Sequence, residues 1–111
     1  MKHLTVESKD LLIGDEAADA LTEYAALVAT NGVGDRVDLR CYGADGDEVV
    51  ATIVLSAGTT LLVETSHNAL PEPDNAEAVA YMRSKITQAT SPPPVQPEPD
   101  LHAYENQFDE L

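Results

Sequence analysis

The sequence predicts a single small α+β domain followed by a tail, and three observations indicate this class. Apolar and polar residues alternate through residues 37–66, with two glycine-containing interruptions, as in three consecutive antiparallel strands. Helical periodicity flanks this run on both sides, at about 15–30 and 74–90. Residues 91–99 then contain five of the chain's seven prolines, a composition typical of a linker. The predicted order is therefore β-α-β-β-β-α, an antiparallel three-stranded meander with the helices on one face.

The N-terminal part predicts one short strand and one helix. Residues 3–7 alternate between apolar and polar side chains, as a strand does. Apolar residues 11–13 fit two alternatives, a loop that inserts into the core or further strand pairing after a turn. A helix is expected to begin at Asp15, a good N-cap, and to end near Asn31 and Gly32, which tolerate the left-handed conformation. Its predicted apolar stripe is Ala17, Ala18, Leu21, Tyr24, Ala25 and Val28.

The first turn of the meander, Ala44-Asp45-Gly46, determines the register of the strands on either side. A three-residue loop with a positive φ at its glycine pairs Cys41 with Val49 and Val37 with Ile53. A two-residue loop would slip the register by one residue and turn Ile53 onto the polar face. The apolar pattern therefore favours the three-residue loop.

The second turn, Ala57-Gly58-Thr59, predicts by the same test that Leu55 faces Leu61. The opposite face of the meander is expected to be solvated, as is common for antiparallel sheets. On that face Val54 and Leu62 are predicted to be exposed neighbours and to mediate self-association. The predicted core face consists of Val37, Leu39, Cys41, Val49, Ala51, Ile53, Leu55, Leu61 and Val63.

The second helix is expected to start after Asp74, a capping residue that forms a capping-box-like pair with Glu77. Its predicted stripe is Val79, Met82 and Ile86. The helix should fade near residue 90, so we divide the chain into an α+β domain at 1–90 and a linker of polyproline II character at 91–99. An acidic amphipathic tail follows at 100–111.

The sequence of the tail permits two interpretations. Its apolar residues recur at the spacing of one helical face and precede or follow acidic residues, a pattern suited to docking in a partner's groove. It is also short enough to stay disordered or to fold back on its own domain. The apolar residues of this predicted docking segment are Leu101, Tyr104, Phe108 and Leu111.

The charge of the chain excludes several classes of partner. Twenty acidic and six basic residues give a net charge of −14. Such a surface repels phosphate backbones and anionic headgroups, so neither nucleic acid nor a membrane is an expected partner. The single cysteine, Cys41, permits no intrachain disulfide and suits a reducing, cytoplasmic setting. We find no apolar run long enough for a signal peptide or a membrane span.

No spacing in the sequence assembles a catalytic, cofactor-binding or metal-binding constellation. The three histidines lie far apart, and His67, near Glu64, is the best placed of them to act as a general base. Cys41 falls on the predicted core face and is expected to be a buried thiol. Aspartates surround the glycine of the first turn, but the spaced oxygen ligands of a calcium loop are missing. We therefore predict no cofactor and no metal, and leave enzymatic activity undecided.

These observations favour a small, acidic, non-enzymatic protein-interaction or regulatory domain. We expect it to form a homodimer through its sheet and to dock a protein partner with its tail. A first alternative is a small-molecule-binding or enzymatic subunit with a pocket between sheet and helices near His67. A second is an acidic mimic of nucleic acid that occupies basic grooves. The order helix, three strands, helix is similar to that of the double-stranded-RNA-binding domain, but the acidic start of the second helix does not fit that family's basic pattern.

Overall fold

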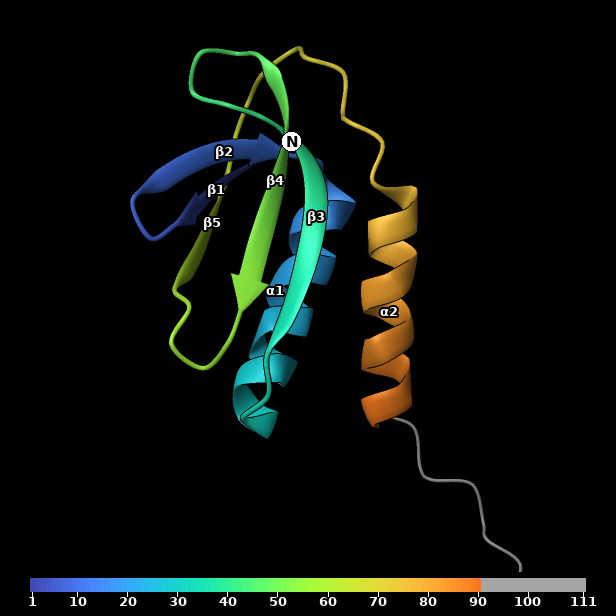
Figure 1. The fold of residues 1–111 in the computed structure, drawn as a ribbon. Helices are drawn as coiled ribbons and strands as arrows, with labels where there is room; N and C mark the ends of the chain where they lie inside the picture. Colours follow the sequence, from blue (N-terminus) through green and yellow to red (C-terminus); the bar gives the residue numbers. More distant parts are fainter. Residues whose placement is uncertain (91–111) are drawn as a thin grey trace, which may run out of the picture.

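The structure, a computed structural model, describes residues 1–90 and combines one five-stranded antiparallel sheet with two helices (Figure 1). The predicted α+β class is confirmed. The strands lie side by side in the order β4-β3-β2-β1-β5. In chain order the elements are β1 (Lys2–Val6), β2 (Lys9–Ile13), α1 (Asp15–Asn31), β3 (Asp35–Tyr42), β4 (Glu48–Leu55), β5 (Leu61–Thr65) and α2 (Ala76–Thr90).

The predicted element order was wrong at one place, because residues 9–13 form a strand. Of the two alternatives for the apolar residues 11–13, strand pairing is confirmed. β1 and β2 make a hairpin in which Leu4 lies opposite Leu11, and both side chains are buried. The turn between them places Glu7 at φ 55°, in the left-handed region. The alternation of apolar and polar residues gives no sign of this turn. The order is therefore β-β-α-β-β-β-α.

The hairpin of β3 and β4 has the predicted register. Cys41 pairs with Val49 and Val37 with Ile53. The loop closes through the Gly43 N–H, which donates to the Asp47 carbonyl at 2.8 Å, and Gly46 adopts the positive φ of 86° that this loop requires. Within the predicted core face, Val49 is the exception, because it is 39% exposed near the end of the hairpin.

The second half of the predicted meander was wrong, because β5 does not pair with β4. It pairs with β1 instead, with Val63 opposite Leu4. Leu55 therefore does not face Leu61. The inward orientation of β5 was nevertheless predicted correctly, and Leu61 and Val63 pack against the core. Alternation determines which side chains of a strand face inward, whichever strand lies beside it.

Helix α1 covers one face of the sheet, and α2 packs beside α1 next to β3 (Figure 1). The N-cap of α1 is Gly14, one residue earlier than predicted, and no side chain caps this end. The predicted C-terminal end is confirmed, since Gly32 is the left-handed C-cap with φ 66°. At the start of α2, the Asp74 carboxylate accepts a hydrogen bond from the Ala76 N–H at 3.0 Å, so it does bond the first turn. The predicted capping box was wrong, because the Asn75 carbonyl accepts the first helical bond and Glu77 bonds no described residue.

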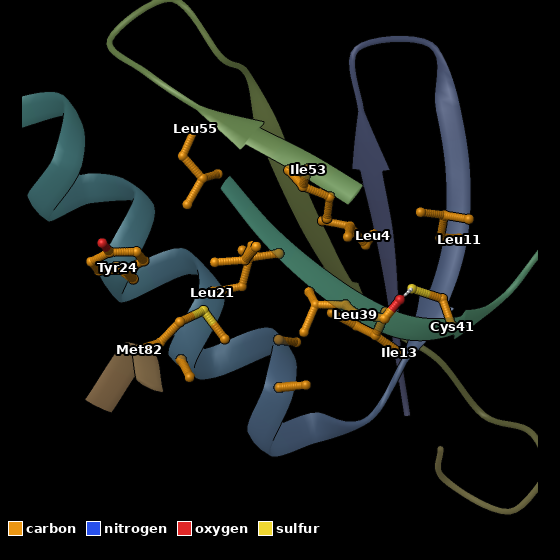
Figure 2. Close-up of a cluster of buried hydrophobic side chains, with 14 of the residues drawn as sticks. Leu4, Leu11, Ile13, Leu21, Tyr24, Leu39, Cys41, Ile53, Leu55 and Met82 are labelled. Carbon is orange, nitrogen blue, oxygen red and sulfur yellow. Dashed lines mark hydrogen bonds between the residues drawn. The ribbon is translucent and has the colours of Figure 1, made fainter. Parts of the chain in front are cut away.

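The core lies between the sheet and the two helices (Figure 2). Cys41 is fully buried in it, as predicted, and Met82 is the one buried side chain that α2 contributes. Val79 and Ile86 complete the predicted stripe of α2 as half-buried neighbours. The fully buried side chains are Leu4, Ile13, Leu21, Val28, Leu39, Cys41, Leu55 and Met82.

Met82→Ala should destabilise the domain by about 3 kcal/mol, because it removes a fully buried side chain and leaves a cavity under α2. Urea unfolding followed by circular dichroism measures this loss. The matched control is Ser84→Ala on the exposed side of the same helix, with a change below about 0.5 kcal/mol. A loss below about 1 kcal/mol for Met82→Ala would show that α2 is anchored elsewhere.

Candidate functional site

β2 leaves β3 after a single residue pair, and this exposes most of one edge of β3. The pair is Leu12 with Tyr42. In an antiparallel strand, alternate residues direct their N–H and C=O to opposite sides. Since Tyr42 bonds toward β2, Arg40, Asp38 and Arg36 also direct their backbone groups toward this edge. The side of β3 away from β4 is therefore a strand edge that β2 fills at one end.

Asn75, at the start of α2, continues the ladder by one step. Its Oδ1 accepts from the Arg40 N–H at 2.7 Å, and its Nδ2 donates to the Arg40 carbonyl at 2.9 Å. The carboxamide thus replaces one residue of a neighbouring strand. The loop before α2 holds it in place, because the Tyr42 hydroxyl donates to the Pro71 carbonyl at 2.7 Å. The contact joins residues 35 positions apart, so no local signal in the sequence predicts it.

Beyond Arg40, the edge of β3 faces α2 across an open groove of about 640 Å³. Among residues 1–90, no backbone or side-chain group pairs with the N–H or C=O of Asp38. The Arg36 N–H is occupied by the Asp35 carboxylate at 2.7 Å. The groove is lined on the strand side by Arg36, Asp38 and Arg40, and on the helix side by Glu77, Ala78 and Tyr81.

The groove carries two cations on a strongly acidic chain. Arg36 and Arg40 are exposed and form no ion pair with any residue that the structure describes. Two other basic side chains are in ion pairs, since Lys2 bonds Asp19 at 2.7 Å and Arg83 bonds Glu23. The two arginines are therefore available to carboxylates, although Asp38, Asp74 and Glu77 keep the groove from being cationic as a whole.

A cluster of two tyrosines around Asp35 closes one end of the groove. The Asp35 carboxylate accepts hydrogen bonds from the hydroxyls of Tyr24 and Tyr81, the latter at 2.6 Å. The two rings meet edge to face with centroids 6.1 Å apart. The cluster joins β3 to both helices, so it fixes the position of α2 and the width of the groove.

The protonation states of this cluster follow from its hydrogen bonds. Burial opposes ionisation of Asp35, but the two tyrosine hydroxyls outweigh it and hold the pKa of Asp35 below its ordinary value. Burial and the bond to Asp35 raise the pKa of Tyr24, and the bond to Asp35 raises that of Tyr81. At neutral pH the aspartate is an ionised acceptor and both tyrosines are donors. This arrangement positions elements and supplies no general base.

A second surface lies along β4, which is an edge of the sheet. Its outward side chains Val50 and Val54 are 65% and 64% exposed. Thr52, between them, donates to the Asp38 carboxylate at 2.6 Å. Leu62 is also exposed, but it lies on β5 at the other edge of the sheet. The prediction that Val54 and Leu62 are neighbours was therefore wrong, because it depended on pairing of β4 with β5.

The remaining predicted groups do not form a reactive centre among the described residues. His67 is exposed in the loop after β5, away from the groove lining. Burial raises the pKa of the Cys41 thiol to about 11, so at neutral pH the group is a protonated core side chain. The tail residues Leu101, Tyr104, Phe108 and Leu111 lie outside the described residues.

Residues 1–90 hold no cluster of three metal-ligating side chains and no helix long and apolar enough to cross a bilayer. No protein-family model, curated protein or solved structure matches this chain. The candidate surfaces are thus defined by their own geometry. They are the groove between β3 and α2 and the outer edge of β4.

Asp35→Ala should destabilise the domain by about 1–2 kcal/mol at neutral pH, because the mutation removes the shared acceptor of two tyrosine hydroxyls at a half-buried site. The folded-state pKa of Asp35 lies below its ordinary value of 3.8. Its ionised form therefore stabilises the fold above that pH, and this contribution is lost as the pH falls through the folded-state pKa.

Urea unfolding of wild type and Asp35→Ala should accordingly differ most at neutral pH and least near pH 2. Asp47→Ala, at the exposed tip of the hairpin, is the control and should change stability by less than about 0.5 kcal/mol. If the free energies of unfolding of the two proteins differed equally at both pH values, ionisation of Asp35 would not contribute to stability.

Proposed function

We propose that this protein is a small interaction domain that self-associates by pairing β4 with β4 of a second copy. The observation that carries this is an eight-residue edge strand whose outward face bears exposed Val50 and Val54. The only charged residue in the strand is Glu48, at its first position. A non-enzymatic role rests on the sequence, which contains none of the catalytic spacings considered above.

β4 lacks the devices that keep natural sheet edges from pairing. Such edges are kept short, or carry lysine, proline or a bulge. β4 is eight residues long and contains neither lysine nor proline, and its pairing with β3 is continuous from Glu48 to Leu55. The other edge strand, β5, has five residues and includes Glu64. The longer and less protected edge is the better candidate for strand addition.

The register of a two-fold β4 pair follows from the hydrogen bonding of β3 and β4. Because Val49 and Ala51 bond toward β3, the even-numbered residues direct their N–H and C=O outward. Of these outward groups, the Val54 carbonyl accepts from the Thr59 hydroxyl at 3.0 Å and keeps one lone pair for a second copy. A two-fold axis at Thr52 then places Thr52 opposite Thr52 of the second copy and Val50 opposite Val54. In this register Glu48 faces Ser56, so no like charges oppose each other. The exposed valines are buried together.

The net charge opposes this association and makes its strength depend on ionic strength. Two copies of a chain with a net charge of −14 repel each other at long range. The proposed contact itself is almost uncharged. Since salt screens the repulsion and leaves the contact of valines and backbone intact, self-association should strengthen as ionic strength rises.

Val50→Asp/Val54→Asp should abolish self-association, because it places carboxylates directly opposite each other in the proposed register. Val50→Lys/Val54→Asp should restore it, since each lysine then faces an aspartate of the second copy. Sedimentation velocity over a concentration series, at low and high salt, measures the mass. We expect a concentration-dependent dimer for wild type that is favoured by salt.

Leu62→Asp is the control on the opposite edge and should leave the dimer intact. Circular dichroism checks that each variant is folded. A wild-type protein that remains monomeric at all concentrations would refute self-association. Dissociation by Leu62→Asp alone would move the contact to β5, and equal behaviour of the two double variants would refute the register.

A further inference from the structure

The groove between β3 and α2 is closed at both ends. At one end Asn75 takes both backbone groups of Arg40. At the other end the Asp35 carboxylate accepts from the Arg36 N–H and from two tyrosine hydroxyls. Arg36 and Arg40 are four positions apart on β3, which is about 13 Å of strand at 3.3 Å per residue. The open stretch between them therefore accommodates about three extended residues.

The middle of the groove offers one complete set of strand-pairing groups. Since the Arg40 backbone bonds toward α2, alternation directs the N–H and C=O of Asp38 to the same side. Among residues 1–90, no group pairs with either of them. The Asp38 carboxylate is turned toward β4, where it accepts from the Thr52 hydroxyl at 2.6 Å. An extended residue laid opposite Asp38 in the antiparallel sense would exchange two hydrogen bonds with its backbone.

The helix side of the groove suits small side chains. Successive side chains of a strand point to opposite faces. The two residues that flank the one opposite Asp38 would therefore direct their side chains toward α2. The groove is lined on this side by Val37, Leu39 and Ala78. Val37 and Leu39 are buried and Ala78 has only a methyl group, so small apolar residues such as alanine fit here.

The two ends of the groove differ in charge. Asp74 and Glu77 lie at the start of α2, at the end that the Asn75 carboxamide closes, and the charge of Arg40 offsets only one of them. At the other end the Arg36 guanidinium forms no ion pair within residues 1–90. The Asp35 carboxylate beside it is already engaged by the tyrosine hydroxyls. One end therefore favours a cation and the other an anion.

We infer that this groove binds a short peptide of about three residues with free ends, extended along β3 and antiparallel to it. The ammonium group of the peptide lies near Asp74 and Glu77, and its carboxylate lies near Arg36. A parallel peptide would place each end beside charge of its own sign. Strand addition of this kind derives affinity from main-chain bonds and specificity from flanking pockets.

The size and charge of the whole molecule fit such a ligand. A groove of about 640 Å³ is within the range of small-molecule sites. A zwitterionic peptide has no net charge, so a chain with a net charge of −14 does not repel it as it would an acidic ligand. The peptide occupies the edge of β3 away from β4, so its binding stands apart from the proposed self-association.

Titration of the ¹⁵N-labelled full-length protein with trialanine near pH 6.5, followed by NMR, tests this inference. The amino group of the peptide, with an ordinary pKa of about 8, is protonated there. The Asp38 amide should shift saturably, because it donates to the peptide. N-acetyltrialanine and trialanine amide each lack one terminal charge, and each should bind about fivefold more weakly or worse. Alanine alone is too short to reach both ends and should not bind measurably.

Variants identify which charge meets which end of the peptide. Arg36→Gln should weaken trialanine binding about fivefold and leave the binding of trialanine amide unchanged. Glu77→Gln should weaken trialanine binding and leave that of N-acetyltrialanine unchanged. Arg40→Gln is the matched control on the same strand and should not weaken binding, and neither should Glu16→Gln on α1. Circular dichroism checks that each variant is folded.

Four results would overturn the inference. They are the absence of a saturable shift at the Asp38 amide, equal binding of trialanine and its blocked forms, weakening by Arg40→Gln in place of Arg36→Gln, and protection of the Asp38 amide from hydrogen exchange before any peptide is added. Val54→Asp, outside the groove, should bind trialanine as the wild type does, whether or not it dimerises. Failure of the proposed self-association and failure of peptide binding are thus read separately.

Discussion

The rest of the described fold depends on the buried cluster beneath the sheet, because Leu12 with Tyr42 is the one residue pair that joins β2 to β3. This pair connects the β5-β1-β2 half of the sheet to the β3-β4 hairpin. Since so short a contact cannot hold two halves together, the core beneath must do so. Leu4 and Ile13 from one half and Leu39 and Leu55 from the other belong to one buried cluster with α1 (Figure 2).

The early separation of β2 from β3 also explains the place of α2. A fully paired β2 would have occupied the edge of β3 that Asn75 and the groove now take. α2 is held at this edge by three contacts of different kinds, all at its start or in its first half. Asn75 bonds the Arg40 backbone, Tyr81 bonds Asp35, and Met82 enters the core. The groove persists because these contacts hold the first half of the helix and leave the backbone of Asp38 between them.

The two candidate surfaces belong to opposite sides of the β3-β4 hairpin. The outer edge of β4 carries exposed valines and almost no charge, which suits a second copy of the same strand. The inner edge of β3 faces α2 across a groove that holds Arg36 and Arg40 together with three acidic side chains. The two surfaces therefore differ in charge as well as in shape.

Local patterns predicted much of this structure. The turn at Gly46 determined the β3-β4 register, alternation placed Cys41 inside and Val54 outside, and helical spacing identified Met82 as the inward residue of α2. The hairpin turn at Glu7 was missed, because a glutamate there gives no left-handed signal. Each success depends on a pattern within one helix or one hairpin, where backbone geometry alone links sequence to conformation.

The sequence by itself therefore determined the class, the helices, the faces of the strands and the one hairpin whose turn residues are distinctive. Only the tertiary structure decided that β5 pairs with β1, that Val54 and Leu62 lie at opposite edges, and that Asn75, Asp35 and Tyr81 shape a groove. The reason is physical. A strand shows the same alternation whichever neighbour it has, and contacts between residues distant in sequence depend on how the whole core is filled.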